Sequence, residues 1–523
     1  MAKSHGHYIL GSDLGTSGCK SIIMDAQGKI IGWALKNYPT KSAYPGWAEQ
    51  DPEDWYKAFC DTVQEAICNA NINSADISVV CIVGITHNAV LLDRQERVLR
   101  QSIIYTDIRS ISQADAILQR WGDKVFERTW NSPGPLWTWP ELMWVRDNEP
   151  AIWSQVDRIL FPKDFVRNRI VPSFLSDPID PVGSLLFDPM ENDWIHEFID
   201  DLGLPQSCFP PICPVTDIVG QVTEGAALET GLKAGTFVAT GTTDTAAEVF
   251  GVGALNCGQA VIKLATVGRI MAISSRPLPN PAFLNYPHVS QGYWYPGTST
   301  KFAASSYSWA REAFWEDVAP DDIYQLMDQA AESVPAGAGG LLFHPYLAGE
   351  FAPSWDPHLR ASFIGLGRDH KRGHFTRAVM EGVGFSLRHA FESVIEMGLV
   401  IDKIRLIGGG TESRLWPQIM ANILNREIAV PIGVDAAYGA AVLAGIAAGI
   451  FENSPQAIHR LIQIRSRHEP QAFEVALYNE LFGIYCETAD AIREVSHKLH
   501  NFQTDQQNQA NGRCLLSPTE AYS

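Results

Sequence analysis

The start of the chain alternates between short apolar runs and polar turns. The apolar runs lie at residues 8–10, 21–24 and 30–33, and the turns between them carry Asp and Gly. Short β-prone runs bounded by such turn residues are typical of strands. The pattern therefore predicts three successive β-strands.

A helix is predicted after these strands. Asp51 is a favourable N-cap and Pro52 suits the first helical position. The apolar residues that recur at helical spacing are Trp55, Phe59, Val63 and Ile67. An apolar run at 79–83 predicts a further strand. Strands that alternate with helices indicate an α/β fold with a largely parallel sheet.

Length and charge narrow the class of protein. A chain of 523 residues can bury at least two cores, and 46% hydrophobic with 19% charged residues is typical of a soluble globular protein. With 40 Lys and Arg against 59 Asp and Glu, the net charge is −19, which argues against nucleic acid or a membrane as partner. Such a chain repels anions at long range, so any phosphate site must be built locally.

The expected compartment is the cytoplasm. The nine cysteines show no metal-ligand spacing, and Met1 to Tyr8 is polar without a signal-peptide core. The run at 436–451 is about 16 residues long, shorter than the roughly 20 that span a membrane. It predicts a buried helix with small packing residues.

One internal repeat is visible. Residues 14–18 (LGTSG) are echoed by residues 264–268 (LATVG), with three of five positions identical. The repeat suggests a duplicated domain with a boundary near Gly251 to Gly253. We expect domains at 1–252 and 253–500, followed by a polar tail at 501–523.

Two strand-to-turn sites carry oxygen groups. In the first, Asp13 precedes the turn 15–18, whose glycines and hydroxyls suit a phosphate, while the carboxylate suits Mg²⁺. In the second, the strand from Phe237 delivers hydroxyls and Asp244 to a helix opening. Asp244 is either a helix cap or a base that accepts a substrate proton. Alone, the first turn is more often only a hairpin.

A third site has three glycines, Gly408 to Gly410, between an apolar strand and a helix. Adjacent glycines let a flat ring or a phosphate approach the backbone. The helix has its apolar face at Trp416, Ile419, Met420 and Ile423. The chain has neither a GxxxxGK[ST] P-loop nor, at these glycines, a GxGxxG dinucleotide motif, so this turn could also be structural.

In this order the motifs resemble the FGGY family of carbohydrate kinases, within the actin, hexokinase and Hsp70 superfamily, and are most similar to xylulokinases. The likeness extends from about residue 8 to about residue 451. It also includes the segments 345–350, 377–382 and 438–441. The resemblance implies two ribonuclease H-like domains around a central cleft for ATP and sugar.

The resemblance also implies roles for single residues. Asp244 would be the catalytic base, a substrate contact and, with Asp13, a ligand of Mg²⁺. Residues expected to contact ATP are Gly15, Thr16, Ser17, Lys20, Thr266, Gly268, Gly409, Gly410 and Ser413. Residues expected to contact the sugar are Thr86, His87, Tyr105 and Asp107.

Several positions depart from the family pattern. Thr86 stands in place of the usual Met, Asn88 of Gly, and Tyr105 of Trp. Phe351 stands where Arg is usual, and Val267 where Ser is usual. The catalytic positions are kept while the sugar-facing ones are altered, which puts the sugar in doubt more than the chemistry.

The expected activity is transfer of the ATP γ-phosphate to a hydroxyl of a small ketose, with D-xylulose the leading candidate. One alternative is a kinase for another pentulose or polyol, such as ribulose, L-xylulose or a glycerol-like compound. Others are a weakly catalytic sugar sensor and an Hsp70-like machine. The expected partners are ATP and the sugar, and the oligomeric state stays open, with a homodimer among the options.

Overall fold

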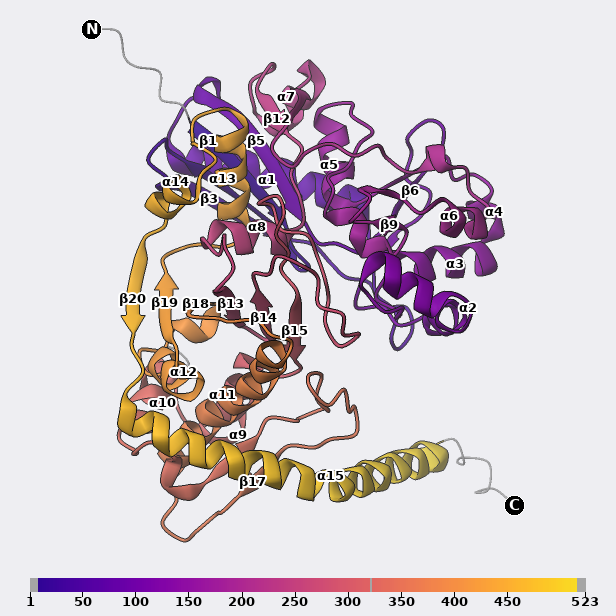
Figure 1. The fold of residues 1–523 in the computed structure, drawn as a ribbon. Helices are drawn as coiled ribbons and strands as arrows, with labels where there is room; N and C mark the ends of the chain where they lie inside the picture. The colour runs from indigo at the N-terminus through magenta and orange to yellow at the C-terminus, as the bar shows by residue number, and fades with distance from the viewer. Residues whose placement is uncertain (1–7, 320–321, 515–523) are drawn as a thin grey trace, which may run out of the picture. The chain divides into compact units, whose positions relative to one another are not determined.

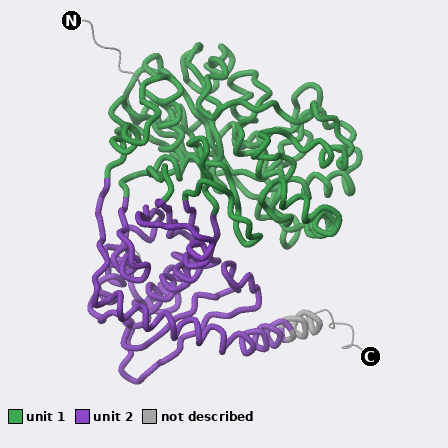
Figure 2. Tube along the Cα trace, in the orientation of Figure 1, with its two compact units in different colours: residues 1–257, 273–296, 431–463 green, residues 258–272, 297–430, 464–523 purple. Residues whose placement is uncertain are grey.

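The computed structural model describes residues 8–319 and 322–514, which form two compact units. Unit 1 contains residues 1–257, 273–296 and 431–463, and unit 2 contains residues 258–272, 297–430 and 464–523 (Figure 2). Each unit is therefore assembled from three segments of the chain. The boundaries expected from the sequence, near residues 252 and 500, stay a prediction.

Unit 1 is built on a six-stranded mixed sheet with the order β11-β12-β5-β1-β2-β3 (Figure 1). β2 pairs antiparallel with β1 and β3, whereas β5 pairs parallel with β1 and β12. The strand bounds are β1 Tyr8–Leu14, β2 Gly18–Met24, β3 Ile30–Asn37, β5 Ile77–Gly84, β11 Ile218–Gln221 and β12 Phe237–Ala239. The three strands predicted at the start of the chain are confirmed.

Two helices pack on the faces of this sheet, α1 (Pro52–Ala70) and α13 (Ala436–Ala447). As predicted, α1 begins after Asp51, whose carboxylate accepts a hydrogen bond from the backbone N–H of Glu53. Leu10 of β1 joins the core that contains the apolar face of α1. Gly11, the next residue, faces α13, because side chains alternate along a strand. α13 is the buried helix predicted from the run at 436–451.

Other helices of unit 1 also concern the site. Their bounds are α2 Ile111–Thr129, α3 Thr138–Asn148, α5 Pro162–Ile170, α7 Glu224–Thr230 and α8 Asp244–Gly251. A 3₁₀ helix, η2, covers Asp180–Ser184. α8 directly follows β12, so the strand delivers its end to a helix start, as the sequence predicts.

Unit 2 has a second six-stranded mixed sheet, with the order β15-β14-β13-β18-β19-β20. The strand bounds are β13 Gln259–Leu264, β14 Gly268–Ala272, β15 Gly297–Thr300, β18 Lys403–Ile407, β19 Glu427–Pro431 and β20 Ile464–His468. The main helices are α9 Ala304–Phe314, α10 Ile323–Glu332, α11 Arg372–Glu396, α12 Trp416–Leu424 and α15 Ala472–Cys514.

The two sheets share one plan. In each, three antiparallel strands (β1 to β3, and β13 to β15) are extended by parallel strands beside the first. The repeated segments 14–18 and 264–268 occupy equivalent places, joining β1 to β2 and β13 to β14. This equivalence supports a duplicated domain, and the expected two-domain α/β class is confirmed.

No helix within the described part of the chain is long and apolar enough to cross a membrane. The tail expected from residue 501 is helical as far as Cys514, where α15 ends, and residues 515–523 lie outside the described part.

Because β1 packs closely on α13, one methyl group added at Gly11 should strongly lower the stability of the protein. A Cβ added at Gly11 would lie 2.3 Å from the carbonyl oxygen of Ala437 and 2.4 Å from the backbone nitrogen of Ala441. Neither atom can move without displacing α13, so Gly11→Ala should lower the free energy of unfolding by at least about 1–3 kcal/mol. Chemical denaturation followed by circular dichroism measures the change.

The matched control is Gly225→Ala, because nothing lies within 4 Å of a Cβ at this exposed position of α7. This change should leave stability unchanged or raise it by up to about 1 kcal/mol. Equal effects of the two substitutions would contradict the described packing.

Candidate active site

The turn between β1 and β2 is held by its own carbonyl groups. The N–H of Gly15 donates to the carbonyl of Gly18 at 3.0 Å, and Gln50 Nε2 donates to the carbonyl of Thr16 at 2.8 Å. Tyr38 donates its hydroxyl to the carbonyl of Gly15. Ser17, at the tip, is exposed. These contacts fix the turn and leave the hydroxyl at its tip accessible to a ligand, as a phosphate site requires.

The two charged residues beside this turn are placed differently. Asp13, near the end of β1, is half-buried and lies opposite Lys20 in the strand register. Lys20 makes an ion pair at 2.5 Å with Asp435, which caps α13 by accepting a hydrogen bond from Tyr438 N–H. The side chain of Lys20 is thus bound within unit 1, and its predicted contact with ATP stays a prediction.

The turn before α8 tests one of the two hypotheses for Asp244, that it caps the helix. The residue that caps α8 is Thr243, whose hydroxyl accepts from Ala246 N–H at 3.2 Å. Asp244 is the first helical residue, and its Oδ1 accepts from Thr245 N–H at 2.5 Å. Its Oδ2 accepts no hydrogen bond from the described residues. Asp244 is therefore not the cap, and a half-buried carboxylate oxygen stays accessible at the positive end of a helix.

The carboxylates of this site raise the pKa values of two buried tyrosines. Burial raises the pKa of Tyr38, and the negative charges of Asp13 and Asp244 raise it further. Burial likewise raises the pKa of Tyr295, with the charge of Asp244 adding to it and a hydrogen bond to Thr243 opposing it. Asp13 and Asp244 thus act on one phenol, Tyr38, although they are 231 residues apart in the sequence. Both belong to unit 1.

The predicted sugar contact His87 lies in a strained and aromatic setting. Its φ is +78°, a left-handed conformation that a residue with a side chain rarely adopts. Its Nε2 is hydrogen-bonded to the hydroxyl of Tyr286, and its ring centre lies 4.6 Å from that of Trp137. A Cβ at Gly183 would lie 2.5 Å from the His87 ring, so the glycine makes room for it.

Tyr105 connects this aromatic group to the turn between β1 and β2. Its hydroxyl is hydrogen-bonded to that of Thr16 at 3.0 Å, and its ring lies edge-on to His87 at 6.4 Å. Thr86 donates its hydroxyl to the carbonyl of Asp180 at 3.4 Å. The structure therefore brings Thr16, His87 and Tyr105 together, although they were predicted for different ligands.

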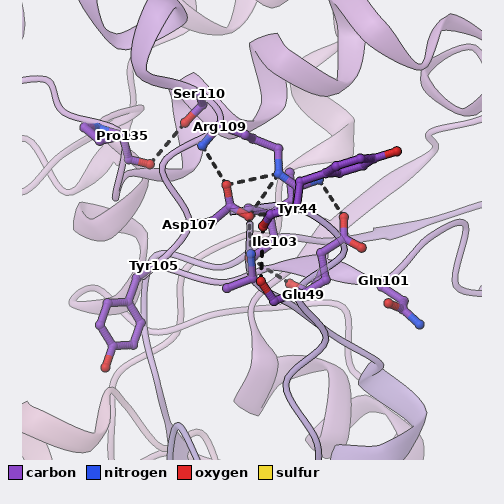
Figure 3. Close-up of polar contacts among 12 residues, drawn as sticks. Tyr44, Glu49, Gln101, Ile103, Tyr105, Asp107, Arg109, Ser110 and Pro135 are labelled. Atoms are coloured by element: carbon purple, nitrogen blue, oxygen red, sulfur yellow. Dashed lines mark hydrogen bonds and ion pairs between the residues drawn. The ribbon is translucent and has the colours of Figure 1, made fainter. Parts of the chain in front are cut away.

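Asp107 is engaged elsewhere. Its carboxylate accepts hydrogen bonds from Arg109 Nε and Nη2 at 3.0 and 2.7 Å, and from Ala48 N–H at 2.5 Å. The guanidinium of Arg109 also pairs with Glu49 at 2.7 Å. Figure 3 shows Asp107 facing Arg109, with the ring of Tyr105 directed away from this pair. The contact of Asp107 with a sugar stays a prediction, because this carboxylate is occupied in fixing the loop.

In unit 2 the equivalent turn is fastened to the start of α9. The carbonyl of Thr266 accepts from Ala303 N–H at 3.1 Å and from Ser305 Oγ at 2.6 Å. A Cβ at Gly268 would lie 2.5 Å from the hydroxyl oxygen of Thr300. Packing alone therefore requires glycine at 268.

The three glycines after β18 have separate roles. Gly408 has φ +94°, and a Cβ there would lie 2.6 Å from the carbonyl oxygen of Leu264. A Cβ at Gly410 would lie 2.5 Å from the Leu264 side chain, whereas nothing lies within 4 Å of one at Gly409. Ser413 accepts from the N–H of Trp416 at 3.1 Å, at the start of α12. Two glycines are required by the fold, and Gly409 leaves open space.

That open space belongs to a cavity of about 730 Å³, a size that suits a nucleoside. Gly409, Gly410 and Ser413 all line it, and their contact with ATP stays a prediction. Tyr307 and Asp328 line it too, joined by a hydrogen bond of 2.7 Å.

Sequence reasoning missed several of these residues. Trp137 and Tyr286 flank His87, but Tyr286 lies 199 residues farther along the chain and in no recognisable motif. Tyr307 and Asp328 lie on α9 and α10, whose amphipathic pattern is that of ordinary packing helices. For Trp137, a run of aromatic residues was the only local signal.

Two α/β units with sheets of one strand order, a carboxylate-bearing turn in one and a nucleoside-sized cavity in the other, are typical of two-domain kinases of small molecules. The chain matches the FGGY family of carbohydrate kinases, N-terminal domain, over residues 8–251 and the C-terminal domain over residues 260–448. It belongs to this family and is an ATP-dependent sugar kinase. The resemblance found in the sequence is confirmed.

Individual relatives are similar over almost their whole length. The xylulose kinase of Bacillus subtilis (strain 168) is 32% identical over 95% of this chain and 99% of its own. That of Escherichia coli (strain K12) is 32% identical over 90% and 96%. The structure of ligand-bound xylulose kinase from Lactobacillus acidophilus has a TM-score of 0.86 at 25% identity, covering 94% of this chain and 100% of that chain.

A kinase with another named substrate fits equally well. The structure of gluconate kinase from Lactobacillus acidophilus has a TM-score of 0.85 at 25% identity, covering 93% of this chain and 98% of that chain. The fold therefore does not distinguish between these sugars.

The open space at Gly409 predicts a selective effect on nucleotide binding. Gly409→Val should place its side chain in the cavity without disturbing the backbone. A steric overlap of about 1–3 kcal/mol would raise the Kd for ADP about 10- to 100-fold. Isothermal titration with ADP measures this change.

Gly483→Val is the matched control, since position 483 is exposed on α15 of the same unit and nothing lies within 4 Å of a Cβ there. It should bind ADP as the unaltered protein does. Normal ADP binding by Gly409→Val would place the nucleoside elsewhere.

Proposed function

We propose that this sugar kinase transfers the γ-phosphate of ATP to a terminal hydroxyl of D-xylulose, with Asp244 as the general base. The observation that carries the role of Asp244 is the cap of α8. Because Thr243 satisfies the helix terminus, the Asp244 carboxylate is accessible for proton transfer. The xylulose kinases at 32% identity support the choice of sugar.

The proposed reaction balances as a direct displacement. The substrate hydroxyl oxygen forms a bond to the γ-phosphorus, the bond from that phosphorus to the β–γ bridging oxygen breaks, and ADP leaves. The hydroxyl proton passes to Oδ2 of Asp244, the oxygen that no described residue occupies. A positioned base of this kind contributes about 10²–10⁴-fold to rate.

The sugar would lie on the side of unit 1 that carries His87 and Tyr105. His87 would donate or accept a hydrogen bond through Nε2, exchanging its bond to Tyr286 for one to a sugar hydroxyl. Trp137 and Tyr105 supply flat walls against the apolar faces of the sugar. The nucleoside would bind in the cavity of unit 2. Thr16 and Ser17 of unit 1 and Thr266 of unit 2 stay the predicted phosphate contacts.

Asp13 and Asp244 fit a Mg²⁺ ion that is held chiefly by phosphates and water. Both offer carboxylate oxygens, the donor type that Mg²⁺ prefers. Among the described residues no cluster of three or more His, Cys, Asp or Glu side chains could hold a metal by itself. Mg²⁺ bound with ATP would neutralise the phosphate charge, and the two carboxylates would orient it.

Loss of the base should lower turnover without preventing binding. Asp244→Asn keeps the shape of the side chain but removes its basicity, so kcat should fall about 10²–10⁴-fold while ADP and sugar still bind. A coupled assay of ADP release gives kcat, and titration gives binding.

Glu224→Gln provides a matched control. Glu224 is the first residue of α7, and that helix is likewise capped by a threonine, Thr223. The control should leave kcat unchanged. Near-normal turnover of Asp244→Asn would exclude it as the base.

The substrate is tested by sugar-dependent ADP release from the unaltered protein. D-Xylulose should give the highest kcat/KM in a panel with ribulose, L-xylulose, glycerol and gluconate. Gluconate is included because a gluconate kinase matches the fold equally well. A higher value with any other compound would overturn the choice of sugar, and release with none would favour a sensor.

A further inference from the structure

A buried ionic network lies within unit 1 and has no role in the reaction described above. The ammonium of Lys163 contacts three carboxylates: Asp164 at 2.5 Å, Asp177 at 2.9 Å and Asp180 at 3.4 Å. Arg167 adds a second cation at 2.7 Å from Asp164. The side chains of these five residues are 0–1% exposed.

Burying such a network costs free energy. Removing each ion from water costs several kcal/mol, and apolar residues of similar size often give equal or greater stability. Three carboxylates also face only two cations. Burial raises the pKa of Asp180 well above its usual range, although Lys163 opposes the shift, and a proton on Asp180 would balance the charges. Stability alone is therefore a poor explanation of the network.

The network is hydrogen-bonded to both ends of the turn that precedes Asp244. Thr242 donates its hydroxyl to Oδ1 of Asp177 at 2.8 Å, and Arg167 Nη1 donates to the carbonyl of Thr240 at 2.7 Å. Between them, Gly241 has φ +78°, and a Cβ there would lie 2.0 Å from the carbonyl oxygen of Ile82. Two partners of Lys163 in the network therefore hold this turn by hydrogen bonds on either side of Gly241.

The same network supports the turn that carries the predicted sugar contacts. Asp180 begins η2, and its carbonyl accepts a hydrogen bond from the hydroxyl of Thr86. Gly183 of η2 lies directly against Thr86 and His87. Thr138 donates to the carbonyl of His87 at 2.6 Å and also contacts the carbonyl of Gly183 at 3.4 Å. One buried group of charges therefore reaches both turns.

We propose that this network positions two turns for the proposed reaction. Lys163 binds Asp177, which holds the turn before Asp244 through Thr242, and it binds Asp180, whose carbonyl holds the turn of His87 through Thr86. Thr242 is the positioning residue that transmits the constraint to Asp244. All of these contacts are made between residues of unit 1. A misplacement of about 1 Å can lower a rate by 10²-fold, which is the scale of effect that such support prevents.

Thr242→Val tests the inference, because valine has nearly the shape of threonine but cannot donate to Asp177. The variant should show kcat lowered about 10- to 100-fold, with the KM for ATP unchanged. Thr242→Ser restores the hydroxyl and should recover most of kcat. Lys163 itself is a poorer target, since its removal would leave three carboxylates buried with one cation and so endanger folding.

The matched control is Thr230→Val. Thr230 is also 0% exposed and donates its hydroxyl at 2.7 Å, but to the carbonyl of Ala226 within α7. Thr230→Val removes a buried hydroxyl of unit 1, as Thr242→Val does, but this hydroxyl is bonded within α7 and not to the network. Its kcat should equal that of the unaltered protein.

A double-mutant cycle separates positioning from general damage. If Thr242 acts through the Asp244 carboxylate, Thr242→Val should have little further effect on kcat when Asp244 is already Asn. Multiplicative losses in the double variant, or an unchanged kcat in Thr242→Val, would overturn the inference while the kinase assignment stands. Absence of sugar-dependent ADP release from the unaltered protein would instead overturn the proposed function on which the inference rests.

Discussion

The contact between Gly241 and the carbonyl of Ile82 is the constraint on which the site in unit 1 depends. It allows β12 to end beside β5 and the chain to turn at once into α8, with a bridge between Gly84 and Thr243 continuing the parallel pairing. No residue with a side chain can approach a carbonyl oxygen at 2.0 Å. Without this close approach, Thr243 would not reach the position from which it caps α8, and Asp244 would not begin a helix.

The parallel strands of the sheet place the other predicted site residues of unit 1 along one edge. β1, β5 and β12 run in one direction, so their carboxyl ends lie along one edge. Asp13 comes from β1, Thr86 and His87 follow β5, and Asp244 follows β12. Residues from distant parts of the sequence lie along this edge because the strands that carry them are neighbours. The buried network of Lys163 and its partners is hydrogen-bonded to two of these turns.

The sequence predicted the features that depend on local chemistry. Alternating apolar runs gave the first strands, Asp51 and Pro52 gave the start of α1, and the repeat at 14–18 and 264–268 occupies equivalent turns in the two sheets. Each of these features needs only a few neighbouring residues. The fold class followed from the same signals, because strand and helix periods are written into the order of side chains.

What could not be predicted rests on contacts between distant residues. The sequence left Asp244 as either cap or base, and only the hydrogen bond of Thr243 in the folded turn decided against the cap. Gly409 and Gly410 are adjacent glycines, yet only three-dimensional packing shows that a Cβ would have open space at Gly409 and would clash with Leu264 at Gly410. Lys163 is an isolated lysine in the sequence, and its partners Asp177 and Asp180 are near it only after folding.

Two residues that depart from the family pattern, Asn88 and Tyr105, are connected by a hydrogen bond. Asn88 Oδ1 accepts a hydrogen bond from the N–H of Tyr105 at 2.8 Å, and Tyr105 in turn is bonded to Thr16. A glycine at 88 and a tryptophan at 105 would provide neither the side-chain acceptor nor the hydroxyl, so the two altered residues form one connected change. Asn88 is also 0% exposed, and its Nδ2 donates to no group in the described chain. A buried donor without a partner is costly. The altered residues therefore connect Thr16, which is predicted to contact ATP, with Tyr105, which is predicted to contact the sugar.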